Sequence, residues 1–227
     1  MKTKIQKILP PGKSGNAEIQ HFNVSQQQAS LHFMYSTLRG QANMYVPPGN
    51  YVRLLIDGKL VMSDTPAELA MTKEFVDKAH GHVLVTGLGL GLVVLDLFKK
   101  PEVKSVTVIE KNVHVIRLTY PRINKFLSKR YEFIVSHKDA FEWKPCDMIT
   151  IPKDMRWNCI LHDIWSDIND LNLPDMFKLK RRYAHWLDKS DPDRFQFAWS
   201  EKEAHWMRSM INKARSVKRR VRLKAGV

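Results

Sequence analysis

Several features that define other classes of protein are scarce in this chain. Cysteine occurs only at Cys146 and Cys159, too few for a disulfide framework and without the Cys-x-x-Cys spacing of zinc or redox sites. No stretch approaches the roughly 20 apolar residues that a membrane-spanning helix needs. Pro10, Pro11 and Gly12 interrupt the start before a signal-peptide core could form. These absences favour a cytoplasmic protein without a membrane segment.

Acidic residues are outnumbered by basic ones. The chain has 37 Lys and Arg against 23 Asp and Glu, a net charge of +14. Such a charge attracts phosphate-rich or acidic partners and repels polycations over long range. Hydrophobic residues make up 44% of the 227 residues, enough for one principal domain with a sizeable core. The composition therefore indicates a globular protein biased toward polyanions.

The first part of the chain contains one clear signal. Residues 1–44 show no sustained apolar period, so we assign them no firm structure and interpret them as an arm or a lid. Residues 51–63 predict a β-hairpin, because two apolar runs flank the turn-forming pair Asp57-Gly58. Thr65-Pro66-Ala67-Glu68 then combines a capping box with a proline suited to a first helical position. We therefore divide the chain into an N-terminal arm with a hairpin, residues 1–64, and a cofactor-binding domain, residues 65–227.

Strands alternate with helices from Gly81 onward. Pro121 is expected to end a helix, and Ser200 with Glu203 forms a second capping box that opens the last helix. The alternation predicts an α/β fold with a Rossmann-like, mostly parallel sheet of about five strands and an N-terminal β-hairpin extension. A sheet with so few strands leaves an edge strand or a face exposed, which a second copy of the chain would cover. A homo-oligomer is therefore one prediction. The predicted strands are 82–86, 103–109, 131–136, 158–162 and 194–198, and the predicted helices include 91–100, 112–120 and 174–187.

A glycine loop and an acidic residue follow the first two predicted strands of that sheet. Gly87, Gly89 and Gly91 let the backbone approach a ligand closely and expose amide groups at the start of a helix. Glu110 ends the second strand, where a carboxylate can accept both hydroxyls of an adenosine ribose. The dinucleotide fingerprint would need glycine at Leu92, so the loop favours another nucleoside ligand over NAD.

Further acids stand at equivalent places along the chain. Asp139 follows the third predicted strand and Asp163 ends the fourth. The carboxyl ends of parallel strands meet at one edge of a sheet, where ligands bind. The histidines lack paired metal spacing, so no metal is expected.

These segments resemble one known superfamily. Residues 83–91, Val-Leu-Val-Thr-Gly-Leu-Gly-Leu-Gly, with residues 106–110 resemble motif I and its acidic follower in class I S-adenosylmethionine-dependent methyltransferases. Asp139-Ala140-Phe141 resembles the adenine-contacting segment of that superfamily. The hairpin end at residues 62–66 is similar to the spermidine-synthase branch, and His162-Asp163-Ile164-Trp165 resembles small phage and bacterial members of it.

The resemblance implies a role for each candidate residue. Asp163 would face the transferred group as base or orienter, since such a reaction needs an aligned nucleophile and a proton acceptor. The cofactor would be S-adenosylmethionine or its decarboxylated form. The methionine part would lie against Gly87, Gly89 and Gly91, the ribose on Glu110, and the adenine on Asp139 and Ala140.

The sequence also departs from the polyamine-making enzymes of that branch. Leu60-Val61-Met62 replaces their glutamines, and residues 163–167 replace an Asp-Ser-Ser-Asp-like run. Methyl transfer to an unidentified small-molecule or nucleic-acid acceptor is therefore the leading hypothesis. Aminopropyl transfer from decarboxylated S-adenosylmethionine is the alternative, and a non-catalytic nucleic-acid-binding protein that retains the fold is a third.

The last predicted helix becomes strongly basic. Trp206, Met210 and Ala214 recur at helical spacing and indicate an apolar face. The basic residues beyond them are a candidate contact for nucleic-acid phosphates, the alternative being a solvated tail. They are Lys213, Arg215, Lys218, Arg219, Arg220, Arg222 and Lys224.

Overall fold

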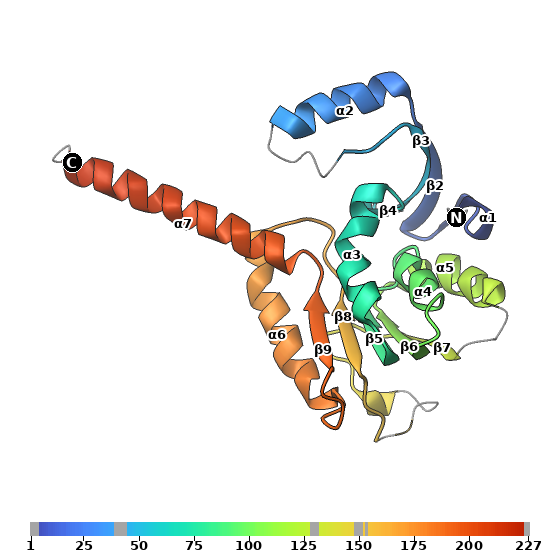
Figure 1. Cartoon of the computed structure of the whole chain (residues 1–227). Coiled ribbons are helices and arrows are strands. Elements are labelled where there is room, and N and C mark those ends of the chain that lie inside the picture. Colours follow the sequence, from blue (N-terminus) through green and yellow to red (C-terminus); the bar gives the residue numbers. More distant parts are fainter. Residues whose placement is uncertain (1–4, 39–44, 128–131, 148–151, 153, 225–227) are drawn as a thin grey trace.

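The computed structural model describes residues 5–38, 45–127, 132–147, 152 and 154–224, which form two β-sheets with flanking helices (Figure 1). The larger sheet has five strands, all parallel, in the order β7-β6-β5-β8-β9. This confirms the predicted Rossmann-like α/β fold. The strands are β5 (Gly81–Thr86), β6 (Val103–Glu110), β7 (Glu132–His137), β8 (Cys159–His162) and β9 (Phe195–Ala198).

Helices cover both faces of this sheet. Successive strand residues point to opposite faces, so Val83 and Val85 pack in one apolar cluster with α3, α4 and α5, whereas Leu84 packs in a second cluster with α6. Burial on both faces explains the apolar, β-branched strand sequences. The helices are α3 (Pro66–Lys78), α4 (Leu92–Leu97), α5 (Val113–Phe126), α6 (Leu173–Tyr183) and α7 (Glu201–Lys224), with 3₁₀ turns η2 (Pro145–Asp147), η3 (Asp170–Asn172) and η4 (Ala184–Trp186).

The smaller sheet is antiparallel and contains the predicted hairpin. Strands β3 (Gly49–Ile56) and β4 (Lys59–Ser63) are joined by Asp57 and Gly58, whose φ angles are 51° and 73°. Left-handed conformations at both central residues are what a type I′ turn requires. The hairpin is therefore confirmed, with β3 two residues longer at its start than the predicted run.

The first 44 residues are more ordered than expected. They contain α1 (Ile5–Ile8), β1 (Gly12–Ser14), β2 (Ala17–Val24) and α2 (Gln26–Leu38), so the expectation of no firm structure was wrong there. Residues 1–4 and 39–44 lie outside the described residues. Only Ala17 and Ile19 of β2 are fully buried, too few for a recognisable period, and pairing with the distant strand β3 holds β2 in place.

Two predicted capping boxes do not form. Helix α3 begins at Pro66 as predicted, but the Thr65 hydroxyl lies 3.0 Å from the Ser63 hydroxyl and makes no cap. Glu68 accepts a hydrogen bond from the backbone N–H of Ser63. Ser200 precedes α7 with a φ of 54°, and its buried hydroxyl has no hydrogen-bond partner. Both helices therefore begin without the predicted side-chain cap.

Pro121 does not end its helix. Helix α5 continues through it to Phe126. A proline inside a helix removes one backbone hydrogen bond, and burial of Val115, Leu118 and Ile123 against the core offsets that loss.

None of the helices in the described residues combines the length and apolar character needed to cross a membrane. The domain division after residue 64 and the homo-oligomer remain predictions. Residues of both sheets, such as Leu54 and Val83, share one apolar cluster.

Candidate functional site

A cavity of about 670 Å³ opens where β5, β6, β7 and β8 end. Small-molecule and cofactor sites typically enclose about 300 to 1,000 Å³. The antiparallel sheet forms the facing wall with Ile56, Val61 and Met62. The predicted site residues in its wall are Gly87, Gly89, Glu110, Asp139, Ala140 and Asp163.

Gly87 allows two loops to meet at the floor of the cavity. Its φ is 99°, and a Cβ atom there would lie 1.9 Å from the carbonyl oxygen of Asp163. The Asp163 N–H in turn donates to the carbonyl of Thr86 at 2.8 Å. Glycine at this position is therefore required by the contact between the loops that follow β5 and β8.

Gly89 is covered by a methionine from the hairpin. A Cβ atom on Gly89, whose φ is 50°, would lie 2.5 Å from the sulfur of Met62. That sulfur accepts a hydrogen bond from the Leu90 N–H at 3.2 Å. Met62 carries no functional signal in the sequence, because it is one apolar residue of a strand. Strand β4 thus forms a roof over the glycine loop.

Gly91 lies outside the cavity wall, unlike the other two glycines. It is the N-cap of α4 with a φ of 70°, and a Cβ atom there would come 3.0 Å from the side chain of Ile123. Gly91 therefore permits close packing of α4 on α5. The cofactor role predicted for it stays a prediction.

Glu110 holds the glycine loop to the start of α5. One carboxylate oxygen accepts from the Leu88 N–H at 2.9 Å and the other from the Asn112 N–H at 2.7 Å. The nearly buried carboxylate therefore has partners within the protein, in addition to the ribose hydroxyls predicted as its ligand. Each oxygen retains a second lone pair, so both can also accept a hydroxyl from the cavity.

Asp139 and Ala140 form a fixed turn after β7. One Asp139 carboxylate oxygen accepts from the Phe141 N–H at 2.8 Å. The buried Ala140 offers its carbonyl to the Tyr183 hydroxyl at 2.8 Å. The turn therefore presents a rigid segment to the cavity. Its contact with adenine stays a prediction.

Asp163 shares the cavity wall with a second carboxylate, Glu68 of α3. Burial raises the pKa of Asp163 to about 7, and the negative charges of Glu68 and Glu110 add to that effect. Burial also raises the pKa of Glu68, although its hydrogen bond from Ser63 opposes the rise. In the sequence Glu68 shows only a capping pattern, since its approach to Asp163 depends on how α3 packs.

His162 does not join Asp163 in the cavity. It is fully buried between strands, 3.3 Å from the Thr86 hydroxyl and 3.1 Å from the Gln196 amide oxygen. Burial lowers its pKa to about 4, which keeps the ring neutral. Across the described residues, no three His, Cys, Asp or Glu side chains gather in a way that could hold a metal ion.

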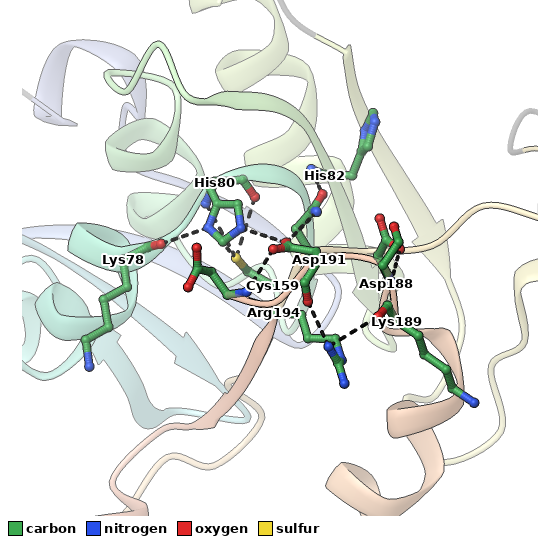
Figure 2. Close-up of polar contacts among 11 residues, drawn as sticks. Lys78, His80, His82, Cys159, Asp188, Lys189, Asp191 and Arg194 are labelled. Carbon is green, nitrogen blue, oxygen red and sulfur yellow. Dashed lines mark hydrogen bonds and ion pairs between the residues drawn. The ribbon is translucent and has the colours of Figure 1, made fainter.

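A Cys-His-Asp cluster lies at the opposite edge of the sheet, where β5 and β8 begin (Figure 2). His80 bonds Asp191 at 2.8 Å through one ring nitrogen, and its other nitrogen lies 3.5 Å from the sulfur of Cys159. Cys159 is fully buried, and burial raises the pKa of its thiol to about 11. Because a nucleophilic cysteine needs an accessible thiolate, this cluster is a structural tie. It joins the loop before β9 to the start of β5.

The charge state of His80 follows from its partners. Burial opposes protonation, but hydrogen bonds to the Lys78 carbonyl and to Asp191 outweigh it and raise the pKa of His80. The hydrogen bonds from Asn158 and His80 lower the pKa of Asp191. The pair is therefore ionic at mildly acidic pH.

Comparisons with known proteins give a likeness of fold. No protein-family model matches the sequence, and the comparison with curated proteins gives no match. The spermidine synthase of Thermotoga maritima aligns with a TM-score of 0.44 and 14% identity over 79% of this chain and 52% of that one. A coclaurine N-methyltransferase, solved with N-methylheliamine and SAH, aligns with a TM-score of 0.39 and 21% identity over 58% of this chain and 34% of that one.

A third solved structure aligns in a similar way. A putative protein-L-isoaspartate O-methyltransferase from Plasmodium falciparum, in complex with S-adenosyl-L-homocysteine, aligns with a TM-score of 0.36 and 14% identity over 46% of this chain and 51% of that one. This chain spans 52% of the spermidine synthase and less of the coclaurine enzyme. At these identities the likeness concerns the arrangement of strands and helices.

Proposed function

We propose that this chain binds S-adenosylmethionine in the cavity and transfers its methyl group to an acceptor beside Asp163. The observation that carries the proposal is the composition of one cavity wall, which contains a glycine loop, Glu110 and Asp163 together. A nucleoside needs hydroxyl acceptors and a close backbone, and a transfer reaction needs a proton acceptor nearby.

The residues of the wall fit such a cofactor in chemical type. Glu110 would accept the ribose hydroxyls, and the turn at Asp139 and Ala140 would border the base. The Leu90 N–H is held by the thioether of Met62, a weak acceptor that a stronger one can replace. When bound, the cofactor supplies a methyl group already activated on a sulfonium, so the protein has to position the acceptor and remove its proton.

Asp163 is suited to the removal of that proton. A general base works best when its pKa lies near the working pH, and the pKa of Asp163 is about 7. With Glu68 beside it, this end of the cavity concentrates negative charge. Such a wall attracts a cation, so we infer an acceptor with an amine group. The attraction is local and acts against the long-range repulsion from the net charge of +14.

Aminopropyl transfer from the decarboxylated cofactor is the second candidate. The carboxylate pair Asp163 and Glu68 favours this reaction. Its negative charge would attract the extra amine of an aminopropyl donor and also a diamine acceptor. The two reactions differ in the donor that the site prefers.

Calorimetry and product analysis test the proposal. We expect S-adenosylmethionine and S-adenosylhomocysteine to bind, and the decarboxylated cofactor to bind more weakly. Incubation with a panel of primary amines should then give products heavier by one methyl group in mass spectrometry. Asp163→Asn should form them about 100- to 10,000-fold more slowly while still binding S-adenosylhomocysteine. Tighter binding of the decarboxylated form with aminopropylated products would select the second candidate. No binding of any of the three compounds would refute both.

A further inference from the structure

Helix α7 extends beyond the body of the molecule (Figure 1). Its first turns are anchored, since Ala204 is buried against Leu173 and Met176, and Arg208 donates to Asp170 at 2.5 Å. Beyond this anchor, residues 212–216 are exposed. The helix continues to Lys224. The exposed residues 212–216 therefore form a surface that the proposed transfer reaction does not use.

The charge of the second half of α7 has one sign. The segment from Lys213 to Lys224, both ends included, has seven basic residues and no acidic ones. At about 1.5 Å per residue this segment is about 18 Å long, so positive charges occur about every 2.6 Å along it. Duplex DNA carries one negative charge per about 1.7 Å of its axis. The two densities are comparable.

Helical spacing divides the basic positions of this segment into two groups. With 3.6 residues per turn, Lys213, Arg220 and Lys224 fall on one side. Arg215, Lys218, Arg219 and Arg222 fall on the other, and Ala214, Val217 and Val221 lie between the two sides.

We propose that residues 213–224 of α7 dock in the major groove of duplex DNA. That groove is about 12 Å wide and admits an α-helix about 10 to 12 Å across, with a phosphate strand on either side. Two basic sides match the two phosphate strands, and the small apolar strip between them would face the base edges. Double-stranded RNA fits less well, because its major groove is deep and narrow.

Two other occupants fit the same helix less well. A second copy of α7 would place seven positive charges against seven, which opposes pairing. A membrane-surface helix has one broad apolar face with large side chains opposite one charged face. Here the large exposed apolar side chains, Trp206 and Met210, precede the basic segment, and the positions between its two basic sides hold only Ala214, Val217 and Val221. Charge complementarity therefore favours a nucleic acid.

Salt-dependent binding tests this docking site. The full chain, without any cofactor, is titrated into a fluorescein-labelled 20-base-pair DNA duplex, and anisotropy is read at several sodium chloride concentrations. Each neutralised phosphate contributes about 0.9 to the slope of log K against log salt. Arg215→Gln, Arg219→Gln and Arg222→Gln combined should therefore reduce the slope by about 2 to 3 and weaken binding about 100-fold at 0.1 M salt.

A matched control removes the same charge from the body of the protein. Lys59, Lys104 and Lys144 are exposed residues of β4, β6 and the segment before η2, outside α7, so replacing all three with Gln should change affinity less than about threefold. Equal losses in the two triple variants would overturn the proposal, because they would indicate a general effect of net charge. Circular dichroism checks that α7 stays helical in both.

Competing ligands complete the test. Single-stranded DNA and duplex RNA of the same length should bind more weakly than the DNA duplex. Equal or tighter binding of either would contradict groove docking. Binding to phosphatidylserine vesicles without binding to the duplex would replace the nucleic acid by a lipid surface. Since no cofactor is present, these outcomes are independent of the transfer reaction.

Discussion

The ionisation of Asp163 should make the protein lose stability as the pH rises through neutrality. Its pKa is about 7 in the folded chain, against 3.8 as its ordinary value. The folded state therefore holds a proton on Asp163 between these pH values, whereas the unfolded chain has released it. By linkage, the free energy of unfolding falls as the pH rises from about 4 to about 7. Asp163→Asn removes this dependence, because an amide does not ionise.

The magnitude follows from the two pKa values. Their difference corresponds to about 4 kcal/mol for the fully ionised carboxylate. Asp163 is partly exposed at the cavity wall, so we expect solvent to reduce the effect to about 2 kcal/mol. Asp163→Asn should therefore be about as stable as the wild type at pH 4 and about 2 kcal/mol more stable at pH 9. The same variant should lose a factor of about 100 to 10,000 in transfer rate, as expected for loss of a general base.

Urea unfolding at intervals from pH 4 to pH 9 measures this difference. His80, whose pKa is also raised, contributes a slope of the same sign. The wild type and the variant share that slope, so only their difference reports Asp163. Asp167→Asn, at an exposed residue in the same loop, is the matched control and should follow the wild type. If the unfolding free energies of the wild type and Asp163→Asn change with pH in parallel, Asp163 ionises in the folded protein without loss of stability. Asp163 would then lack the pKa near 7 that suits a general base.

Three further predictions concern contacts around the sheet. Glu110→Ala should weaken cofactor binding about 10- to 150-fold, and a 2′-deoxy cofactor should bind the wild type poorly but suffer little further loss in the variant; equal deoxy penalties in both proteins would exclude ribose recognition. Gly89→Ala should destabilise the fold more than Gly58→Ala, because both residues have positive φ but only Gly89 faces Met62. Thermal denaturation measures this, and the difference in stability between the two variants should become smaller in a Met62→Ala background. Asp191→Asn should lower the unfolding free energy by about 1 kcal/mol at pH 5.5 and by less at pH 9, since the benefit of a protonated His80 is present below 6.5 and is lost as the pH rises through its raised folded pKa; an NMR titration of His80 that is unchanged in the variant would contradict this.

From residue 51 onward, the sequence alone determined the order of the main strands and helices and the position of the glycine loop. Those features depend on local chemistry, namely apolar β-branched runs and turn residues such as Asp57-Gly58. The same reasoning located Glu110 and Asp163 at strand ends, because parallel strands deliver their carboxyl ends to one edge. It could not recognise β2, whose few buried residues gain their place by pairing with β3.

Only the tertiary structure decided which residues meet. Met62 covers Gly89 and Glu68 approaches Asp163 because the hairpin and α3 pack over the carboxyl edge of the sheet. Thr65 fails to cap α3 because its hydroxyl pairs with that of Ser63, and Ser200 precedes α7 in a left-handed conformation with no partner for its hydroxyl. The pKa of Asp163 likewise depends on burial and on neighbouring charges from distant parts of the chain. Such contacts join residues far apart in sequence, so no local pattern carries them.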